Sequence, residues 1–153
     1  MKIRPVTAKS VRRDICNRIL RSLPDWFGIE EAINDYVRNA ADLPMFCCFD
    51  GHTAAAFLSV KIHYKYSAEV YVMGVLPQYH RRGIGRELLK SAEVFLKKKG
   101  VRFLQVKTLS PSRSCREYEI TRKFYLAQGF VPLEEFKTLW GAANPCLLMI
   151  KGI

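Results

Sequence analysis

One stretch of the sequence combines glycine and arginine residues in a spacing suited to binding an anion. Residues 72–89 read VMGVLPQYHRRGIGRELL, in which two glycines stand among basic residues: Arg81, Arg82, Gly83, Gly85 and Arg86. An apolar run typical of a strand precedes this loop, and a helical pattern follows it. A helix that begins there has unpaired backbone N–H groups at the positive end of its dipole, and glycine lets an oxygen atom approach closely. The loop therefore predicts an anion site, and a pyrophosphate is its natural occupant.

Taken alone, this loop leaves two interpretations open. It lacks the third glycine of a dinucleotide-binding fingerprint and the Gly-Lys-Ser/Thr ending of a P-loop, so those two motifs are excluded. Gly83 and Gly85 could also serve only to cap a tight strand-to-helix turn, with the arginines in solvent.

The elements that must position the loop follow from the apolar periodicity along the chain. The pattern predicts helices at about 10–23, 28–41, 83–99 and 115–128. It predicts strands at 3–6, 45–49, 52–60, 68–75, 101–109, 130–136 and 146–150, with an Asp-Gly hairpin turn at 50–51 and a loop around residues 63–67. The order β-α-α-β-β-β-α-β-α-β-β predicts a mixed α/β fold, and we expect one domain over residues 1–153.

Composition and charge narrow the function classes. The chain has 153 residues and a net charge of +11, which predicts an anionic partner: nucleic acid, an acidic peptide or a phosphorylated cofactor. The start has no secretory pattern, and no run approaches ~18 apolar residues, so we expect a cytoplasmic protein without a membrane partner. The five cysteines form no C-x-x-C pair, which favours buried free thiols and predicts no metal site.

A wider stretch resembles a known family. Residues 68–89, AEVYVMGVLPQYHRRGIGRELL, closely resemble the signature of the GCN5-related N-acetyltransferase (GNAT) superfamily, Gln/Arg-x-x-Gly-x-Gly/Ala after the fourth strand. RKFYLAQGF at 122–130 is similar to a later segment of the family, and the predicted element order is the GNAT order. The sequence departs from the motif at its first position, where His80 replaces Gln or Arg. We expect that change to alter local hydrogen bonding without abolishing cofactor binding.

The resemblance implies a fold, a cosubstrate and a set of contacts. It implies a GNAT-type fold whose mixed central sheet splays between strands 4 and 5 and is flanked by helices, and it implies acetyl-CoA as cosubstrate with no metal. The splay and the thioester would fall at Met73, Gly74 and Val75, with the Val75 N–H facing the thioester carbonyl. Contacts to the diphosphate would fall to Arg81, Arg82, Gly83, Ile84, Gly85 and Arg86.

The same resemblance implies two catalytic residues. Glu69 corresponds to the family's glutamate base, and Tyr125 to its tyrosine acid near the cofactor sulfur. For Glu69 the alternative is a solvated residue at the start of its strand. Helical spacing places Ile120 with Phe124 on a face expected to pack, and Tyr125 on the opposite face, expected to be available; a merely wet face is the alternative for Tyr125.

The acceptor is the least determined part of the prediction. The resemblance implies that Trp26, Phe27 and Tyr118 contribute to binding a small-molecule or peptide amine, and the further candidates are Tyr64, Tyr66 and Trp140. Trp26 and Phe27 could instead cap the core, and the claims of His52 and His63 are weaker still.

Two other function classes stay open. These are an acyl-CoA sensor without turnover and a basic nucleic-acid-binding module. We do not expect nucleic acid as the partner, because the arginines gather at one helix start. The apolar segment 144–150 could form a homodimer contact or a buried strand.

Overall fold

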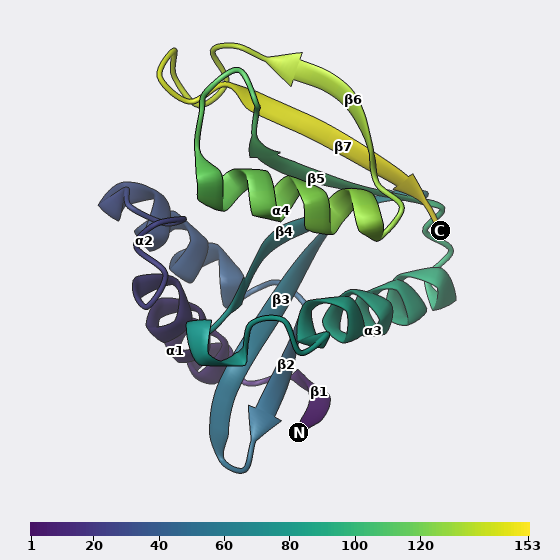
Figure 1. Cartoon of the computed structure of the whole chain (residues 1–153). Helices are drawn as coiled ribbons and strands as arrows, with labels where there is room; N and C mark the ends of the chain where they lie inside the picture. Colours follow the sequence, from purple (N-terminus) through teal and green to yellow (C-terminus); the bar gives the residue numbers. More distant parts are fainter. The chain divides into compact units, whose positions relative to one another are not determined.

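The computed structural model describes residues 1–153 and has the predicted order of elements (Figure 1). The helices are α1 (Lys9–Arg21), α2 (Glu30–Ala40), α3 (Ile84–Lys98) and α4 (Arg116–Ala127), with a short 3₁₀ turn at Pro77–Tyr79. The strands are β1 (Lys2–Val6), β2 (Met45–Asp50), β3 (Thr53–Tyr64), β4 (Ser67–Val75), β5 (Phe103–Leu109), β6 (Val131–Phe136) and β7 (Cys146–Gly152). None of the helices combines the length and the apolarity that crossing a membrane requires.

The seven strands form one mixed sheet, which confirms the predicted fold class. Their order is β1-β2-β3-β4-β5-β7-β6. β4 and β5 run parallel, with Ser67–Val70 paired to Phe103–Val106. The pairs β1–β2, β2–β3, β5–β7 and β6–β7 are antiparallel. The parallel pair needs a crossover connection, and α3 lies in it.

The chain groups into two compact units. The N-terminal unit comprises residues 1–61 and 71–99, and the C-terminal unit comprises residues 62–70 and 100–153. The division falls within β3 and within β4, so each of these strands contributes one segment to each unit.

The core of the N-terminal unit is built on the apolar stripes of its helices. In α1, Ile15, Cys16, Ile19 and Leu20 are buried as predicted, whereas Val11 is 42% exposed. The stripe packs with Phe57 of β3 and Val72 of β4 in a single cluster. Close packing also explains the glycine within β4.

Gly74 lies where α1 comes nearest to the strand. A Cβ atom there would lie 2.9 Å from Cγ2 of Ile19 and 3.1 Å from Cδ1 of Leu23. Real Cβ atoms essentially never approach a neighbour to 2.9 Å. Glycine is therefore required at position 74 because the helix would otherwise be pushed away from the strand.

The hairpin between β3 and β4 differs from the prediction. Residues 63–67 were expected to form a loop, but β3 continues to Tyr64 and β4 begins at Ser67, leaving a turn of Lys65 and Tyr66. The prediction was wrong because this turn contains none of the Gly, Asn, Asp or Pro residues that usually mark a two-residue connection.

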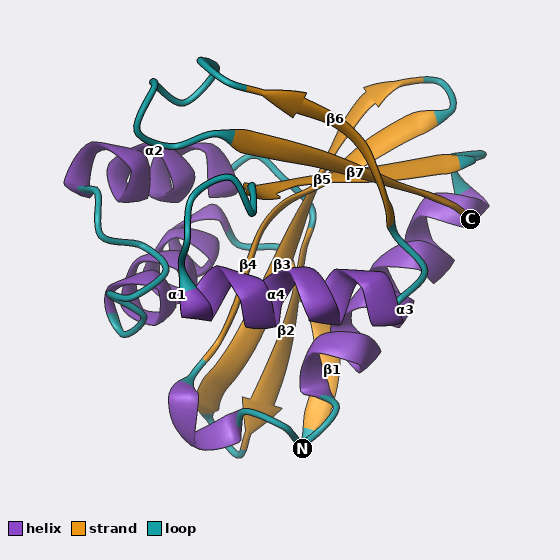
Figure 2. Cartoon of the chain, turned by 45° about the horizontal axis from the view of Figure 1, so that its top comes forward, coloured by secondary structure: helices purple, strands orange, loops and turns teal.

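In the C-terminal unit β5, β7 and β6 lie side by side (Figure 2). Leu104 of β5 pairs with Lys151 of β7. The Lys151 side chain in turn lies against the segment that follows α4. Its Nζ lies 5.9 Å from the ring centroid of Phe130, and its Cε lies 3.4 Å from where a Cβ on Gly129 would be. Arg122 of α4 also donates a hydrogen bond of 2.6 Å to the backbone oxygen of Leu109. The face of β5 that carries Leu104, Val106 and Thr108 is therefore the face that α4 and Phe130 cover.

The packed face of α4 differs from the one predicted, although Phe124 of the predicted face is half-buried. Ile120 is 55% exposed, whereas Tyr125 is only 5% exposed and Tyr118 and Thr121 are half-buried. The prediction failed because it ranked faces by apolar content, and the large aromatic rings on the other face bury more surface.

Candidate active site

The glycine-arginine loop has the local geometry of an anion site. Gly83 is the N-cap of α3, with φ 76° and ψ 8°, and no side chain caps this helix end. The first backbone bond of the helix runs from the Glu87 N–H to the Gly83 oxygen, at 3.1 Å. The N–H groups of Ile84, Gly85 and Arg86 therefore have no partner within the helix, and they lie at the positive end of its dipole.

The backbone of the loop turns through the left-handed region twice. Arg81 has φ 61°, and it is the one residue other than glycine with positive φ. Gly83 is needed for its conformation and not for lack of room, because a Cβ there would meet only Nη2 of Arg86, at 3.9 Å. The open space beside Gly83 gives an anion access to the backbone.

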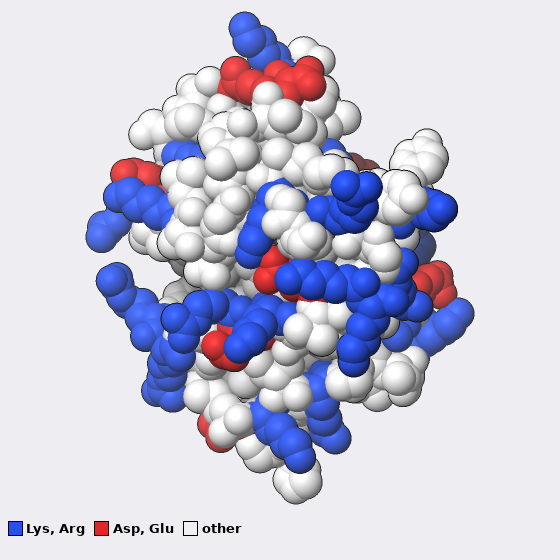
Figure 3. Space-filling view, turned by 90° about the vertical axis from the view of Figure 1, so that its right-hand side faces the viewer, with Lys and Arg blue, Asp and Glu red and all other residues white.

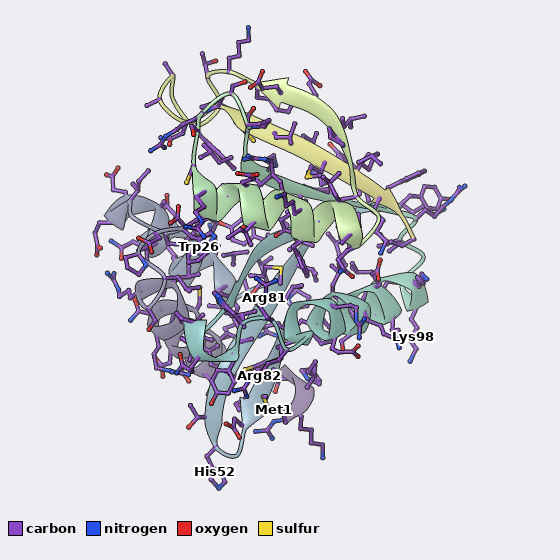
Figure 4. All side chains as sticks on the ribbon, viewed as in Figure 1. Met1, Trp26, His52, Arg81, Arg82 and Lys98 are labelled. Atoms are coloured by element: carbon purple, nitrogen blue, oxygen red, sulfur yellow. The ribbon has the colours of Figure 1, made fainter.

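The three predicted arginines of this loop are exposed, and Figure 4 shows Arg81 and Arg82 in the segment that precedes α3. The guanidinium carbon of Arg82 lies 5.4 Å from the centroid of the Tyr79 ring, and Nε of Arg86 lies 3.5 Å from Oε1 of Glu87. Ile84 is buried, so this predicted contact residue can offer a ligand only its backbone.

His80, which replaces the usual first residue of the family motif, ties the loop to the end of β4. Its Nε2 lies 2.6 Å from the backbone oxygen of Val75; because a carbonyl oxygen can only accept, Nε2 carries the proton and donates. The ring of Trp26 meets the His80 ring edge-on, with centroids 5.8 Å apart. This hydrogen bond links the loop to the strand segment that contains Met73, Gly74 and Val75.

Glu69 lies at the centre of a polar cluster built from three strands. Its Oε1 lies 2.7 Å from Nε2 of His63 on β3. On β5, Nζ of Lys107 lies 3.1 Å from Oε2 and 3.3 Å from Oε1, and Nε2 of Gln105 lies 3.4 Å from Oε1. The Glu69 side chain is only 8% exposed, so the alternative of a solvated residue at the strand start is wrong.

Glu69 and Tyr125 lie on opposite faces of the sheet in the C-terminal unit. Glu69 pairs with Gln105 in the β4–β5 register, whereas the neighbouring Val106 belongs to the face covered by α4. Tyr125 lies on α4, where its ring packs edge-on against Phe124 and Phe130 at centroid distances of 5.3 and 5.4 Å. A proton could therefore leave on one face and be supplied on the other.

The predicted acceptor residues are divided between the two units. Trp26 and Phe27 are half-buried and pack against the core of the N-terminal unit, and the Phe27 ring meets that of Tyr36 edge-on, with centroids 5.9 Å apart. Tyr118 belongs to the C-terminal unit and is half-buried; burial raises its pKa to about 12. Each of these three rings retains some exposed surface. The packing of Trp26 and Phe27 also agrees with the alternative in which these two rings only cap the core.

Sequence reasoning gave His63 little weight and missed Lys107. Neither residue belongs to a motif, and Lys107 lies 38 positions from Glu69 along the chain. Only the β3–β4 hairpin and the register Glu69↔Gln105 bring them together. Alternation along β5 could have found Lys107 once that register was known, because residues 105 and 107 share a face.

Comparison with known proteins supports the family resemblance. Residues 13–130 match the family model described as "Acetyltransferase (GNAT) family". No curated protein sequence matches the chain.

Three similar solved structures illustrate the range of relatives. An aminoglycoside 6'-N-acetyltransferase from Enterococcus faecium has a TM-score of 0.80 at 17% identity, over 99% of this chain and 97% of that one. A GNAT family acetyltransferase from Elizabethkingia anophelis, with acetyl-CoA bound, has a TM-score of 0.74 at 16% identity, over 99% and 97%. The ribosomal-protein-S18-alanine N-acetyltransferase from Escherichia coli has a TM-score of 0.76 at 18% identity, over 99% and 94%.

The structural likeness extends over nearly the whole chain, and the family model covers both the glycine-arginine loop and α4. On these grounds the chain belongs to the GNAT family of acetyltransferases.

Proposed function

We propose that this chain transfers an acetyl group from acetyl-CoA to a primary amine of a small molecule or peptide, by direct attack of the amine on the thioester. The observation that carries the proposal is the turn at Gly83, with left-handed backbone, open space and unpaired N–H groups at the start of α3. An acetyltransferase that uses acetyl-CoA needs such a place for the diphosphate.

In this proposal the diphosphate binds to the N–H groups of Ile84, Gly85 and Arg86 beside Gly83, and its charge is met by the guanidinium groups of Arg81, Arg82 and Arg86. Exposed guanidinium groups suit this role, because they pair with phosphate oxygens through several hydrogen bonds. The thioester end is assigned to Met73, Gly74 and Val75, and the Val75 N–H is assigned to the oxyanion that forms when the amine attacks.

Two proton transfers complete the reaction. The amine nitrogen forms a bond to the acetyl carbon, the C–S bond breaks, and the nitrogen loses a proton toward the base site at Glu69. Tyr125 gives its hydroxyl proton to the departing thiolate. Within the C-terminal unit, Glu69 is buried and Tyr125 belongs to the other face of the sheet, which suits one group that accepts a proton and another that donates one.

The proposed acceptor class is a primary amine next to apolar or aromatic surface. Trp26, Phe27 and Tyr118 are assigned to it, since aromatic rings attract an ammonium group and pack on its carbon chain. The names of two similar enzymes specify an aminoglycoside in one case and an alanine of a ribosomal protein in the other. We therefore keep both small molecules and peptides in the class.

The test combines binding with turnover. Calorimetric titration with acetyl-CoA should show saturable one-to-one binding. Thiol release from acetyl-CoA, followed with Ellman's reagent across a panel of primary amines, should identify an acceptor. For that acceptor Tyr125→Phe should lower kcat while the Kd for acetyl-CoA stays nearly constant.

Three outcomes would contradict the proposal. Binding of acetyl-CoA without turnover of any amine would indicate an acyl-CoA sensor. Failure to bind acetyl-CoA, together with strongly salt-dependent binding of a short DNA duplex, would indicate a nucleic-acid-binding module. Equal losses of kcat and affinity in Tyr125→Phe would assign that ring to packing.

A further inference from the structure

The cluster around Glu69 leaves this carboxylate little freedom to accept a proton from a substrate. Three side chains make four contacts of 2.7–3.4 Å with its two oxygens. A carboxylate offers about four lone-pair positions, so these contacts account for the capacity of Glu69. An incoming amine would have to displace Lys107, Gln105 or His63 to reach it.

The same contacts fix which nitrogen of His63 carries hydrogen. Lys107 supplies a positive charge 3.1 Å from Oε2 and Gln105 an amide N–H, so Glu69 faces donors from β5 and acts as a carboxylate acceptor. A carboxylate cannot donate, so the 2.7 Å contact requires that Nε2 of His63 donates. In the neutral imidazole the lone pair is then on Nδ1, and the side chain is 28% exposed, against 8% for Glu69.

We infer that His63 is the group that removes the proton from the acceptor amine, and that Glu69 is a positioning residue which acts through it. This assignment rests on the proposed function and refines its base site. As the amine nitrogen bonds to the acetyl carbon, its N–H bond breaks and the proton passes to Nδ1 of His63. The imidazolium so formed keeps its Nε2–H bond to Glu69, whose negative charge stabilises it.

Lys107 has a defined part in this arrangement. Its Nζ pairs with Oε2 of Glu69 at 3.1 Å, while Oε1 of the same carboxylate accepts from His63, so Lys107 helps to hold the carboxylate in place. The charged group in contact with His63 is Glu69 from β4, which in turn pairs with Lys107 from β5, while Lys61 and Lys65 are the nearest charged neighbours of His63 along the chain. A Lys107 variant would leave the nearly buried carboxylate of Glu69 without its cation, so it would test stability more than catalysis.

The experiment compares His63→Gln and Glu69→Gln, with His52→Gln as the matched control at the β2–β3 turn (Figure 4). For an amine that the wild-type chain acetylates in the thiol-release assay, kcat/KM of the wild type and of each variant is measured from pH 5 to 9. His63→Gln should lower kcat by ~10²–10⁴-fold and remove the limb that deprotonation of the base contributes to the kcat/KM profile, with the Kd for acetyl-CoA unchanged. Glu69→Gln should lower kcat but keep that limb, and His52→Gln should behave as wild type.

A second variant guards against an effect of misfolding. In His63→Ala, added imidazole should restore part of the turnover, which a purely structural role would not allow. The assignment is overturned if His63→Gln keeps both the limb and a near-wild-type kcat. It is also overturned if Glu69→Gln alone removes the limb, because Glu69 would then be the base itself.

One readout does not depend on turnover. Long-range ¹H–¹⁵N spectra of histidine-labelled protein without ligand should show neutral His63 protonated at Nε2, and in Glu69→Gln this preference should weaken. Protonation at Nδ1 in the wild-type chain would overturn the inference even if the acetyltransferase activity is confirmed. Conversely, no turnover of any amine would refute the proposed function and with it the base role, although the spectrum would still report the tautomer.

Discussion

Replacing Gly83 by aspartate should separate the stability of α3 from anion binding. The left-handed conformation at φ 76° costs most residues about 1–2 kcal/mol, but aspartate and asparagine tolerate it better than others. Aspartate is also a favoured N-cap residue, and Gly83 occupies that position in open space. We therefore expect the free energy of unfolding to fall by no more than about 1 kcal/mol, or about 2–4 °C in Tm.

The effect on cofactor affinity should be much larger. A carboxylate about 6 Å from a phosphate charge, at an effective dielectric constant of about 20, is repelled by about 3 kcal/mol. That repulsion corresponds to roughly a 100-fold increase in the Kd for acetyl-CoA. Gly83→Asn adds similar bulk without charge, so the difference between the two variants measures the electrostatic part.

Gly51 provides the matched control. It has φ 61°, lies in the β2–β3 turn, and has nothing within 4 Å of where a Cβ would be. Gly51→Asp therefore introduces a similar backbone cost without a predicted ligand nearby. Calorimetry gives Kd and thermal unfolding gives Tm; if Gly83→Asp binds acetyl-CoA as tightly as Gly51→Asp does, the loop does not hold the diphosphate.

Three further predictions concern packing and titration. Gly74→Val should lower the free energy of unfolding by about 1–3 kcal/mol, because Cγ2 of Ile19 already lies 2.9 Å from where a Cβ would be at that position. Urea unfolding measures this change, and an unchanged midpoint would contradict the close packing. Burial raises the pKa of Tyr118 from 10.0 to about 12, so its contribution to stability is present below pH 10 and is lost as pH rises toward 12. Between pH 10 and 12 the free energy of unfolding, followed by circular dichroism, should therefore fall less in Tyr118→Phe than in the wild type. Parallel falls in the two proteins would contradict a contribution of Tyr118. Ellman's reagent at pH 8 should react rapidly with one thiol per native chain, the half-buried Cys115, and with all five after denaturation; several fast thiols would contradict the burial of the other four.

Much of the fold could be predicted because its signals are local. The Asp50-Gly51 turn, the apolar stripes of the helices and the glycine stops act within a few residues, and each element was found within a few residues of its observed ends. The loop at Gly83 belongs to the same class, because left-handed backbone at a strand-to-helix turn favours glycine wherever it occurs.

The features that were predicted wrongly depend on distant parts of the chain. The face that α4 buries is chosen by Phe130 and the sheet, and not by the helix sequence alone. Likewise, His63 meets Glu69 only because β3 and β4 form a hairpin, and its turn of Lys65 and Tyr66 contains no typical turn residue that would predict it. Tyr125 was singled out by the family resemblance, while its burial beside Phe130 could not be read from helical spacing.

The surplus of basic residues has a consequence for how the two substrates of the proposed reaction would arrive. Lysine and arginine side chains prevail over acidic ones on the face shown in Figure 3, in keeping with the net charge of +11. A polyanionic cosubstrate is drawn toward such a surface from a distance, whereas a cationic amine is repelled. The two encounters should therefore respond oppositely to ionic strength: added salt slows capture of the anion and eases approach of the cation.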